Sequence, residues 1–201
     1  MTPKTQTQLL WALLVFLFCA ATRSQLERDP VTHILVQLPA LALVGWLVAS
    51  ALRKRIPVAH LRSDHGMSCL LIALFSIAFW MLPRSIDAAL EDPQMELAKF
   101  LSVPLLIGLP LGLGWQHAHP LVKGFLKANA LSMLGVLAFL FTHAPVRICN
   151  NYLVSDQERL GLGFLYAAFA LTVLWVIPLF TGRGVGERDT IPSVMARRAK
   201  A

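Results

Sequence analysis

The chain has 201 residues, of which 56% are hydrophobic and only 14% are charged, and its formal net charge is +7. Soluble domains carry about 25% charged residues, so this chain has too little polar surface for a water-soluble globule. Its basic residues do not gather on a soluble domain, which argues against nucleic-acid binding. The composition predicts an integral membrane protein.

Six apolar segments follow one another along the chain without the strict alternation of barrel strands. A helix needs about 20 apolar residues to cross a bilayer. The segments therefore predict an all-α, polytopic bundle of about six transmembrane helices, forming one domain over residues 1–180. A polar, basic tail of residues 181–201 follows. The predicted spans are Leu9–Ala21, Val31–Leu52, Gly66–Leu82, Phe100–Trp115, Phe125–Phe141 and Leu160–Phe180.

The first apolar segment has two interpretations. Lys4 precedes it, and the small residues Ala20 and Ala21 end it. This layout fits a membrane helix, and it also fits a signal peptide with a small-residue cleavage region. We favour a retained helix, and removal of the segment would leave the orientation of the other five unchanged.

The distribution of Lys and Arg between successive loops predicts the orientation. If the N-terminus is cytoplasmic, 12 of the 18 basic residues lie on the inner side and 6 on the outer side. The positive-inside rule then places both termini in the cytoplasm of a multi-pass inner (plasma) membrane protein. The basic tail is expected to rest against anionic headgroups of the membrane lipids.

A short acidic segment separates the third and fourth spans on the predicted outer side. It begins at Pro83 and carries Asp87, Glu91, Asp92 and Glu96. Charge this close to hydrocarbon is costly and needs a reason. Asp87 and Glu91 are four residues apart and would share one face of a helix, so the simplest interpretation is a solvated helix at the interface.

Four side chains near the outer boundary form a candidate metal site. They are His33, Met81, His143 and Cys149. Imidazole, thioether and thiolate are ligands that suit copper(I), and a shared depth would let them converge. The alternative is that Met81 fills packing space, the two histidines lie at the polar interface, and Cys149 is a loop thiol.

The remaining motifs favour packing over chemistry. His117 and His119 could form a second metal pair, but a polar turn before Pro120 is the simpler interpretation. Gly108-x-x-x-Gly112 predicts a close approach of two helices, and the prolines of this span should kink it. No catalytic triad or Gly-rich cofactor loop can be argued from spacing, so no enzyme is expected. The spans lack interior charge, which disfavours a small-molecule transporter.

Three groups of residues between His33 and Gly161 resemble the CtaG-type assembly factors of heme-copper (cytochrome c) oxidases, in the same order as in that family. The first is His33 with Gln37. The second group surrounds the acidic segment and consists of Trp80-Met81-Leu82-Pro83, Asp87-Ala88-Ala89-Leu90, Pro93 and Trp115. The third group lies just before and at the start of the last span, and consists of Phe141, Ala144-Pro145, Tyr152, Asp156-Gln157 and Gly161.

The resemblance implies an inner-membrane accessory or assembly factor of the respiratory chain, with oxidase subunits as partners and a link to copper delivery. It also implies that Pro83, Asp87, Asp156 and Gln157 organise the outer loops. The chain carries Met81 where the family has a histidine. The alternative function is a structural or interaction subunit of a membrane complex that holds no metal.

Overall fold

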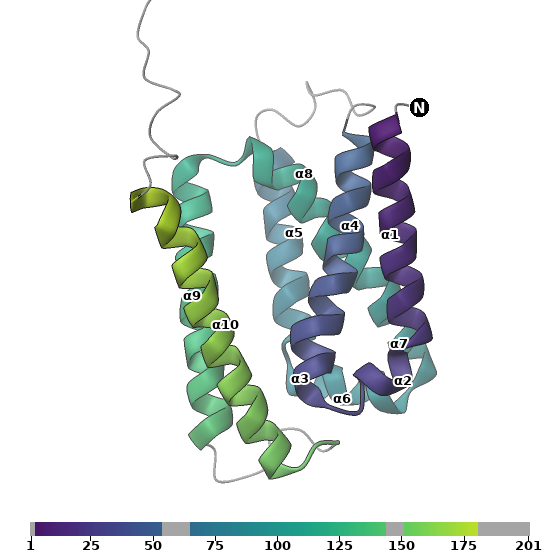
Figure 1. Cartoon of the computed structure of the whole chain (residues 1–201), viewed down its shortest axis with the longest axis vertical. Coiled ribbons are helices and arrows are strands. Elements are labelled where there is room, and N and C mark those ends of the chain that lie inside the picture. Colours follow the sequence, from purple (N-terminus) through teal and green to yellow (C-terminus); the bar gives the residue numbers. More distant parts are fainter. Residues whose placement is uncertain (1–2, 54–64, 144–150, 181–201) are drawn as a thin grey trace, which may run out of the picture.

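A computed structural model describes residues 3–53, 65–143 and 151–180, and the described residues are 92% helical with no strand among them (Figure 1). The predicted all-α fold is confirmed. The elements are α1 (Pro3–Ala21), α2 (Arg23–Leu26), α3 (Pro30–Thr32), the π-helix η1 (His33–Gln37), α4 (Leu38–Leu52), α5 (His65–Trp80), α6 (Pro83–Glu91), α7 (Pro93–Ser102), the π-helix η3 (Val103–Gly108), α8 (Leu109–His117), α9 (Pro120–His143) and α10 (Val154–Phe180).

The described helices include five that are long and apolar enough to cross a membrane. A sixth span is reached if α5 and α6, which are bent by 70° relative to each other, count as one. The chain is therefore a multi-pass membrane protein, as predicted. The five long helices are Pro3–Ala21, Pro30–Leu52, Pro93–His117, Pro120–His143 and Val154–Pro178.

The fourth span begins earlier than predicted, at Pro93 instead of Phe100. The side chain of Asp92 accepts a hydrogen bond from the backbone N–H of Gln94 at 2.9 Å, which caps the helix. Pro93 follows as the first helical residue, where its missing N–H costs nothing. Hydropathy alone misses this start because Gln94, Glu96 and Lys99 interrupt the apolar residues of the first two turns.

Successive spans run in opposite directions, so the start of α1 and the end of α10 lie at the same end of the bundle (Figure 1). We call this the terminal end. The opposite end, which carries α2, α3, α6 and the start of α7, is the hairpin end. These two ends correspond to the two sides between which the predicted loops alternate.

Helix α4 packs against α1, η3 and α8 at the centre of the bundle. Gly45 and Gly108 let the backbones of α4 and η3 touch. A Cβ at Gly108 would lie 2.8 Å from the Cα of Gly45 and would overlap the carbonyl oxygen of Ala42. Gly112 lies against Ala49 in the same way, so the predicted close approach along Gly108-x-x-x-Gly112 is confirmed.

The prolines of the spans are accommodated by a local change of helix type. Pro104 lies within η3, and Pro39 is the second residue of α4, which follows η1 directly. Proline cannot donate to the helical hydrogen-bond ladder, and a π-helical turn re-pairs the backbone in a wider register. The span Pro93–His117 therefore continues through its prolines as one helix, with a π-helical turn at Pro104.

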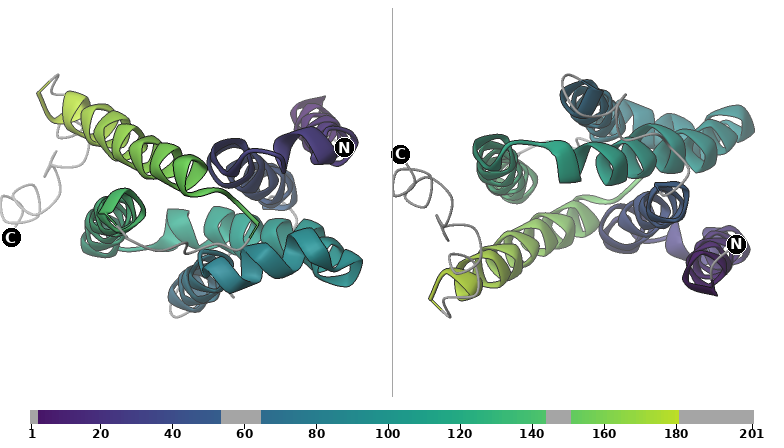
Figure 2. Two further views of the ribbon diagram at one scale, coloured as in Figure 1. Left: turned by 90° about the horizontal axis from the view of Figure 1, so that it is seen from below. Right: turned by 90° about the horizontal axis from the view of Figure 1, so that it is seen from above.

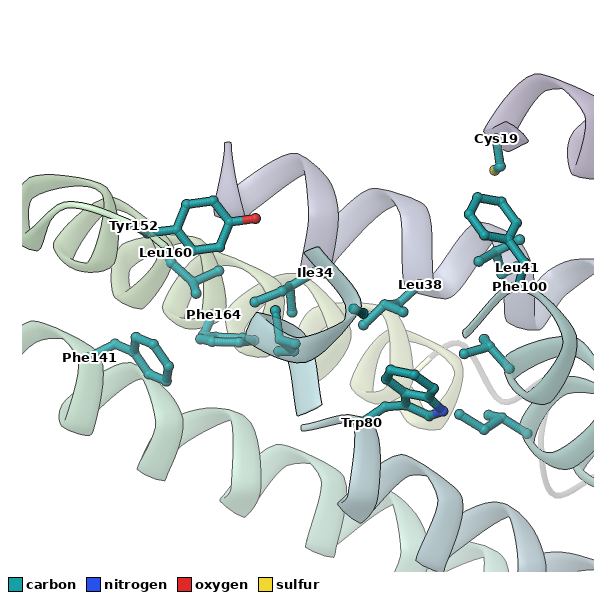
Figure 3. Close-up of a cluster of buried hydrophobic side chains, with 14 of the residues drawn as sticks. Cys19, Ile34, Leu38, Leu41, Trp80, Phe100, Phe141, Tyr152, Leu160 and Phe164 are labelled. Carbon is teal, nitrogen blue, oxygen red and sulfur yellow. The ribbon is translucent and has the colours of Figure 1, made fainter. Parts of the chain in front are cut away.

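Helices α9 and α10 pack mainly on each other and join the rest of the bundle at the hairpin end. There the rings of Phe141 and Phe164 and the side chain of Leu160 meet Ile34 and Leu38 in one apolar cluster (Figure 3). Towards the terminal end α10 moves away from α4, while α9 runs nearly parallel to α5 (Figures 1 and 2). The hairpin end is therefore the better packed half of the molecule.

Candidate functional site

A buried lysine lies at the centre of the hairpin end. Lys99 of α7 is 1% exposed, and burying an ammonium group is costly unless it is paired and hydrogen-bonded. Its Nζ lies 2.6 Å from Oε1 of Glu27, 3.2 Å from Nε2 of His33 and 3.4 Å from Oε1 of Gln37. Three acceptors thus surround the three N–H bonds of the ammonium group. We call Glu27, His33, Gln37, Lys99 and Tyr152 the Lys99 cluster.

The other hydrogen bonds of the Lys99 cluster assign the proton on His33. The Tyr152 hydroxyl donates to the backbone carbonyl of Glu27 at 3.0 Å, and it lies 3.0 Å from Nδ1 of His33. Because the hydroxyl proton is already donated, Nδ1 must carry the proton and donate it to the Tyr152 oxygen. Nε2 then accepts from Lys99, so His33 is neutral and both ring nitrogens are hydrogen-bonded.

The Lys99 cluster joins segments that lie far apart in the sequence. Glu27 ends α2, His33 and Gln37 lie on η1, Lys99 lies on α7, and Tyr152 precedes α10. Gln37 also donates from Nε2 to Oε1 of Glu27 at 3.1 Å. The Tyr152 ring packs beside Leu160 in the apolar cluster (Figure 3). The cluster therefore holds four segments together at one end of the bundle.

A second polar contact links α6 to the segment before α10. Asp87 is 8% exposed, and its Oδ1 accepts from the backbone N–H of Asn151 at 3.4 Å and from Nδ2 at 3.3 Å. Glu91 Oε1 accepts from the same Nδ2 at 3.1 Å. Asp87 and Glu91 share a helix face, as predicted, but Asp87 is buried against Asn151 where a solvated carboxylate was expected.

The other predicted loop residues lie at helix starts. Pro83 is the first residue of α6. Asp156 Oδ2 accepts from the backbone N–H of Leu153 at 3.4 Å at the start of α10. Gln157 is 3% exposed on the same turn. Their role in organising the outer loops stays a prediction.

The predicted copper ligands differ in exposure and in their neighbours. His143 is exposed at the end of α9, where its Nδ1 lies 2.8 Å from Oγ1 of Thr142 and its ring stacks on Phe139 at 4.5 Å. Met81 lies in the turn between α5 and α6 and packs against the hydrophobic core. Cys149 lies outside the described residues.

Coordination of copper through His33 would break an existing hydrogen bond, to either Lys99 or Tyr152. Within residues 3–53, 65–143 and 151–180, no group of three or more His, Cys, Asp or Glu side chains is arranged to hold a metal ion. On the opposite end of the bundle, His119 Nδ1 accepts from the backbone N–H of Leu121 at 3.3 Å. This contact fits the interpretation of His119 as part of a polar turn.

Sequence reasoning missed the centre of the site. Lys99 lies just outside the predicted fourth span, which begins at Phe100, and Glu27 is not among the predicted site residues. One signal could have found the cluster. His33 and Gln37 stand four residues apart at the start of one apolar span, and Lys99 immediately precedes another at the same predicted depth.

Comparison of the chain with protein-family models, curated proteins and solved structures finds no match. The function is therefore argued from the residues and from the geometry of the Lys99 cluster.

Replacing Tyr152 by Phe is expected to lower stability by about 1–3 kcal/mol, because a buried carbonyl and a buried imidazole N–H each lose their partner. The measurement is thermal unfolding in detergent. Tyr166→Phe is the matched control, because Tyr166 is 70% exposed on α10. Equal melting temperatures for Tyr152→Phe and the wild type would contradict the assigned hydrogen bonds.

Proposed function

We propose that this chain is a non-enzymatic accessory or assembly factor of a membrane protein complex, and that the complex is a heme-copper oxidase. The accessory role is supported by the geometry of the hairpin end. The oxidase is supported by the resemblance of the residues around Trp80, Asp87 and Asp156 to the CtaG-type assembly factors.

The observation that carries the proposal is the inward hydrogen bonding of the Lys99 cluster. Lys99 directs its three donors to Glu27, His33 and Gln37, and His33 uses both of its nitrogens within the protein. A catalytic or transport site must offer such atoms to a substrate. In the Lys99 cluster these atoms are hydrogen-bonded within the protein. Such bonding stiffens the hairpin end, and a rigid surface is suited to recognition by a partner protein.

Copper handling at the hairpin end stays a prediction of the residue types and of the resemblance. The engagement of His33 with Lys99 and Tyr152 favours an accessory role that works through protein contact. Met81 and His143 are predicted ligands whose replacement leaves the Lys99 cluster intact. Replacing them therefore distinguishes an accessory role through copper handling from one through protein contact alone.

Orientation and compartment complete the proposal. By the count of Lys and Arg in the sequence, the segments predicted on the side of the two termini carry twice as many basic residues as those predicted on the opposite side. The positive-inside rule then supports a cytoplasmic terminal end and a hairpin end on the outer face of the inner membrane.

Deleting the chain from its native host is expected to lower the amount of assembled heme-copper oxidase, because an assembly factor acts on the yield of its target. The measurements are the heme absorbance spectrum of the membranes, oxidase activity and the oxidase subunits recovered with an affinity-tagged copy of the chain. Unchanged oxidase spectra and activity in the deletion strain would rule out the oxidase as the target.

Complementation variants provide the control for copper. The double variant Met81→Ala with His143→Ala is expected to restore the oxidase as well as the wild-type chain does, because it leaves the Lys99 cluster in place. Restoration by wild type but not by this double variant would support the copper-handling version. Both outcomes require that the wild-type chain and the double variant are present in the membrane in equal amounts.

A further inference from the structure

One side of α9 is left uncovered by the rest of the molecule. Helix α9 packs on α10, where the ring of Phe141 lies 5.8 Å from that of Phe164 and Lys127 lies over the ring of Trp175 at 5.3 Å. Only 11% of the most apolar window of α9 is buried, and α9 stands at the edge of the bundle when it is seen from either end (Figure 2). The side of α9 that faces away from α10 therefore meets the surroundings of the bundle.

The residues on this uncovered side follow a heptad pattern. They succeed one another at alternating steps of four and three residues, which is the spacing of a seam between two parallel helices. Their side chains are exposed, apart from Asn129, which is half-buried. We call them the α9 seam, which consists of Phe125, Asn129, Ser132, Val136 and Phe139.

The α9 seam contains an amide near the middle of a membrane span. Asn129 is the tenth of the 24 residues of α9, about 14 Å along the helix at 1.5 Å per residue, and the hydrocarbon core is about 30 Å thick. In the part of the chain that the structure describes, its side chain has no hydrogen-bond partner. Lipid chains offer none either, and an unpaired polar group in hydrocarbon is costly. The amide is therefore a group that a contact within the membrane would satisfy.

A second copy of the chain supplies the matching group. Two copies lie in the membrane with the same orientation, so a two-fold axis along the membrane normal pairs α9 with α9 in parallel. Each residue of the α9 seam then faces its own copy at the same depth. A side-chain amide carries both donors and an acceptor, so Nδ2 of each Asn129 can donate to Oδ1 of the other. A different partner would have to place a polar group at this depth by its own sequence.

We propose that the chain forms a parallel two-fold dimer through the α9 seam, in which the two Asn129 amides are hydrogen-bonded to each other. A single Asn in an otherwise apolar seam also fixes its register. The α9 seam shares no residue with the Lys99 cluster. The dimer therefore goes beyond the proposed function and does not depend on it.

Native mass spectrometry of the full chain in mild detergent measures the dimer. The wild type is expected to be dimeric, and Asn129→Ala should raise the dissociation constant about tenfold, because it removes hydrogen bonds between membrane helices. The variant should fold as the wild type does, since alanine is a good helix former. Thr172→Ala is the matched control. Thr172 is exposed on α10 and donates to the backbone carbonyl of Ala168 at 2.7 Å, so its loss should leave the dissociation constant unchanged.

Disulfide cross-linking in native membranes tests the geometry. Ser132→Cys should cross-link to its own copy, because Ser132 lies on the seam one turn from Asn129. Thr172→Cys should cross-link no more than the wild type, which carries its own three cysteines. A monomeric wild type, an Asn129→Ala dimer as stable as the wild-type dimer, or equal cross-linking of Ser132→Cys and Thr172→Cys would overturn the proposal. So would cross-linking of Ser132→Cys to another protein in place of a second copy.

Discussion

Replacing Glu27 by Ala is expected to destabilise the protein by about 3–5 kcal/mol, because it leaves the ammonium group of Lys99 buried without its carboxylate. The Nζ of Lys99 is 2.6 Å from Oε1 of Glu27, and the Lys99 side chain is 1% exposed. His33 and Gln37 remain as neutral acceptors, but neither balances the charge. Chemical or thermal unfolding in detergent measures the loss.

A double-mutant cycle separates the charge from the rest of the side chain. Lys99→Met removes the buried charge, so the double variant Glu27→Ala with Lys99→Met should lose less stability than the two single losses combined. Arg23→Ala is the control, because Arg23 pairs with Glu96 at 2.7 Å but is 57% exposed. An exposed pair contributes about 0–1 kcal/mol. Additive losses, or equal losses for Arg23→Ala and Glu27→Ala, would contradict the buried-pair account.

Gly108→Ala is the second substitution with a large expected effect. Its Cβ would overlap the carbonyl oxygen of Ala42 and lie 2.8 Å from the Cα of Gly45. Both neighbours are backbone atoms, so no side chain can move aside and α4 must separate from η3. Overpacking of this kind costs about 1–3 kcal/mol and sometimes more. The expected result is a lower melting temperature and a smaller yield of folded protein.

Gly135→Ala is the matched control for this clash. Gly135 lies on α9, and an added Cβ there meets no atom within 4 Å. Alanine is a better helix former than glycine by about 1 kcal/mol, so this variant should be as stable as the wild type or slightly more so. Equal melting temperatures for the Gly108→Ala and Gly135→Ala variants would show that α4 and η3 are not in backbone contact.

The apolar segments could be predicted from the sequence because hydropathy is a local property. The predicted end of the second span at Leu52 matches the end of α4, and the all-α fold follows from runs that do not alternate. The start of α7 at Pro93 could not be found in this way, since the capping Asp92 and the polar first turns resemble a loop. The same error placed Lys99 outside the helix.

The candidate site could likewise be predicted only in part. The residue types at His33 and Asp87 placed candidate functional residues at the end of the bundle that proves to be the hairpin end, and both residues are buried in polar contacts there. Their partners could not be predicted, because Lys99 and Tyr152 are 66 and 119 residues from His33 in the chain. A pairing over that distance depends on how the helices pack and not on any local pattern. The copper site predicted from His33, Met81, His143 and Cys149 assumed that shared depth brings side chains together.

A multi-pass helical membrane protein can be predicted from local sequence, because each span carries its own length and hydropathy. Which polar groups meet depends on how the helices pack in three dimensions. Glu27, Lys99 and Tyr152 come from segments that no sequence period relates to His33 and Gln37, and a buried charge is stable only where all of its partners are present together. The pairing of α9 with α10 is likewise a result of packing that no local pattern predicts.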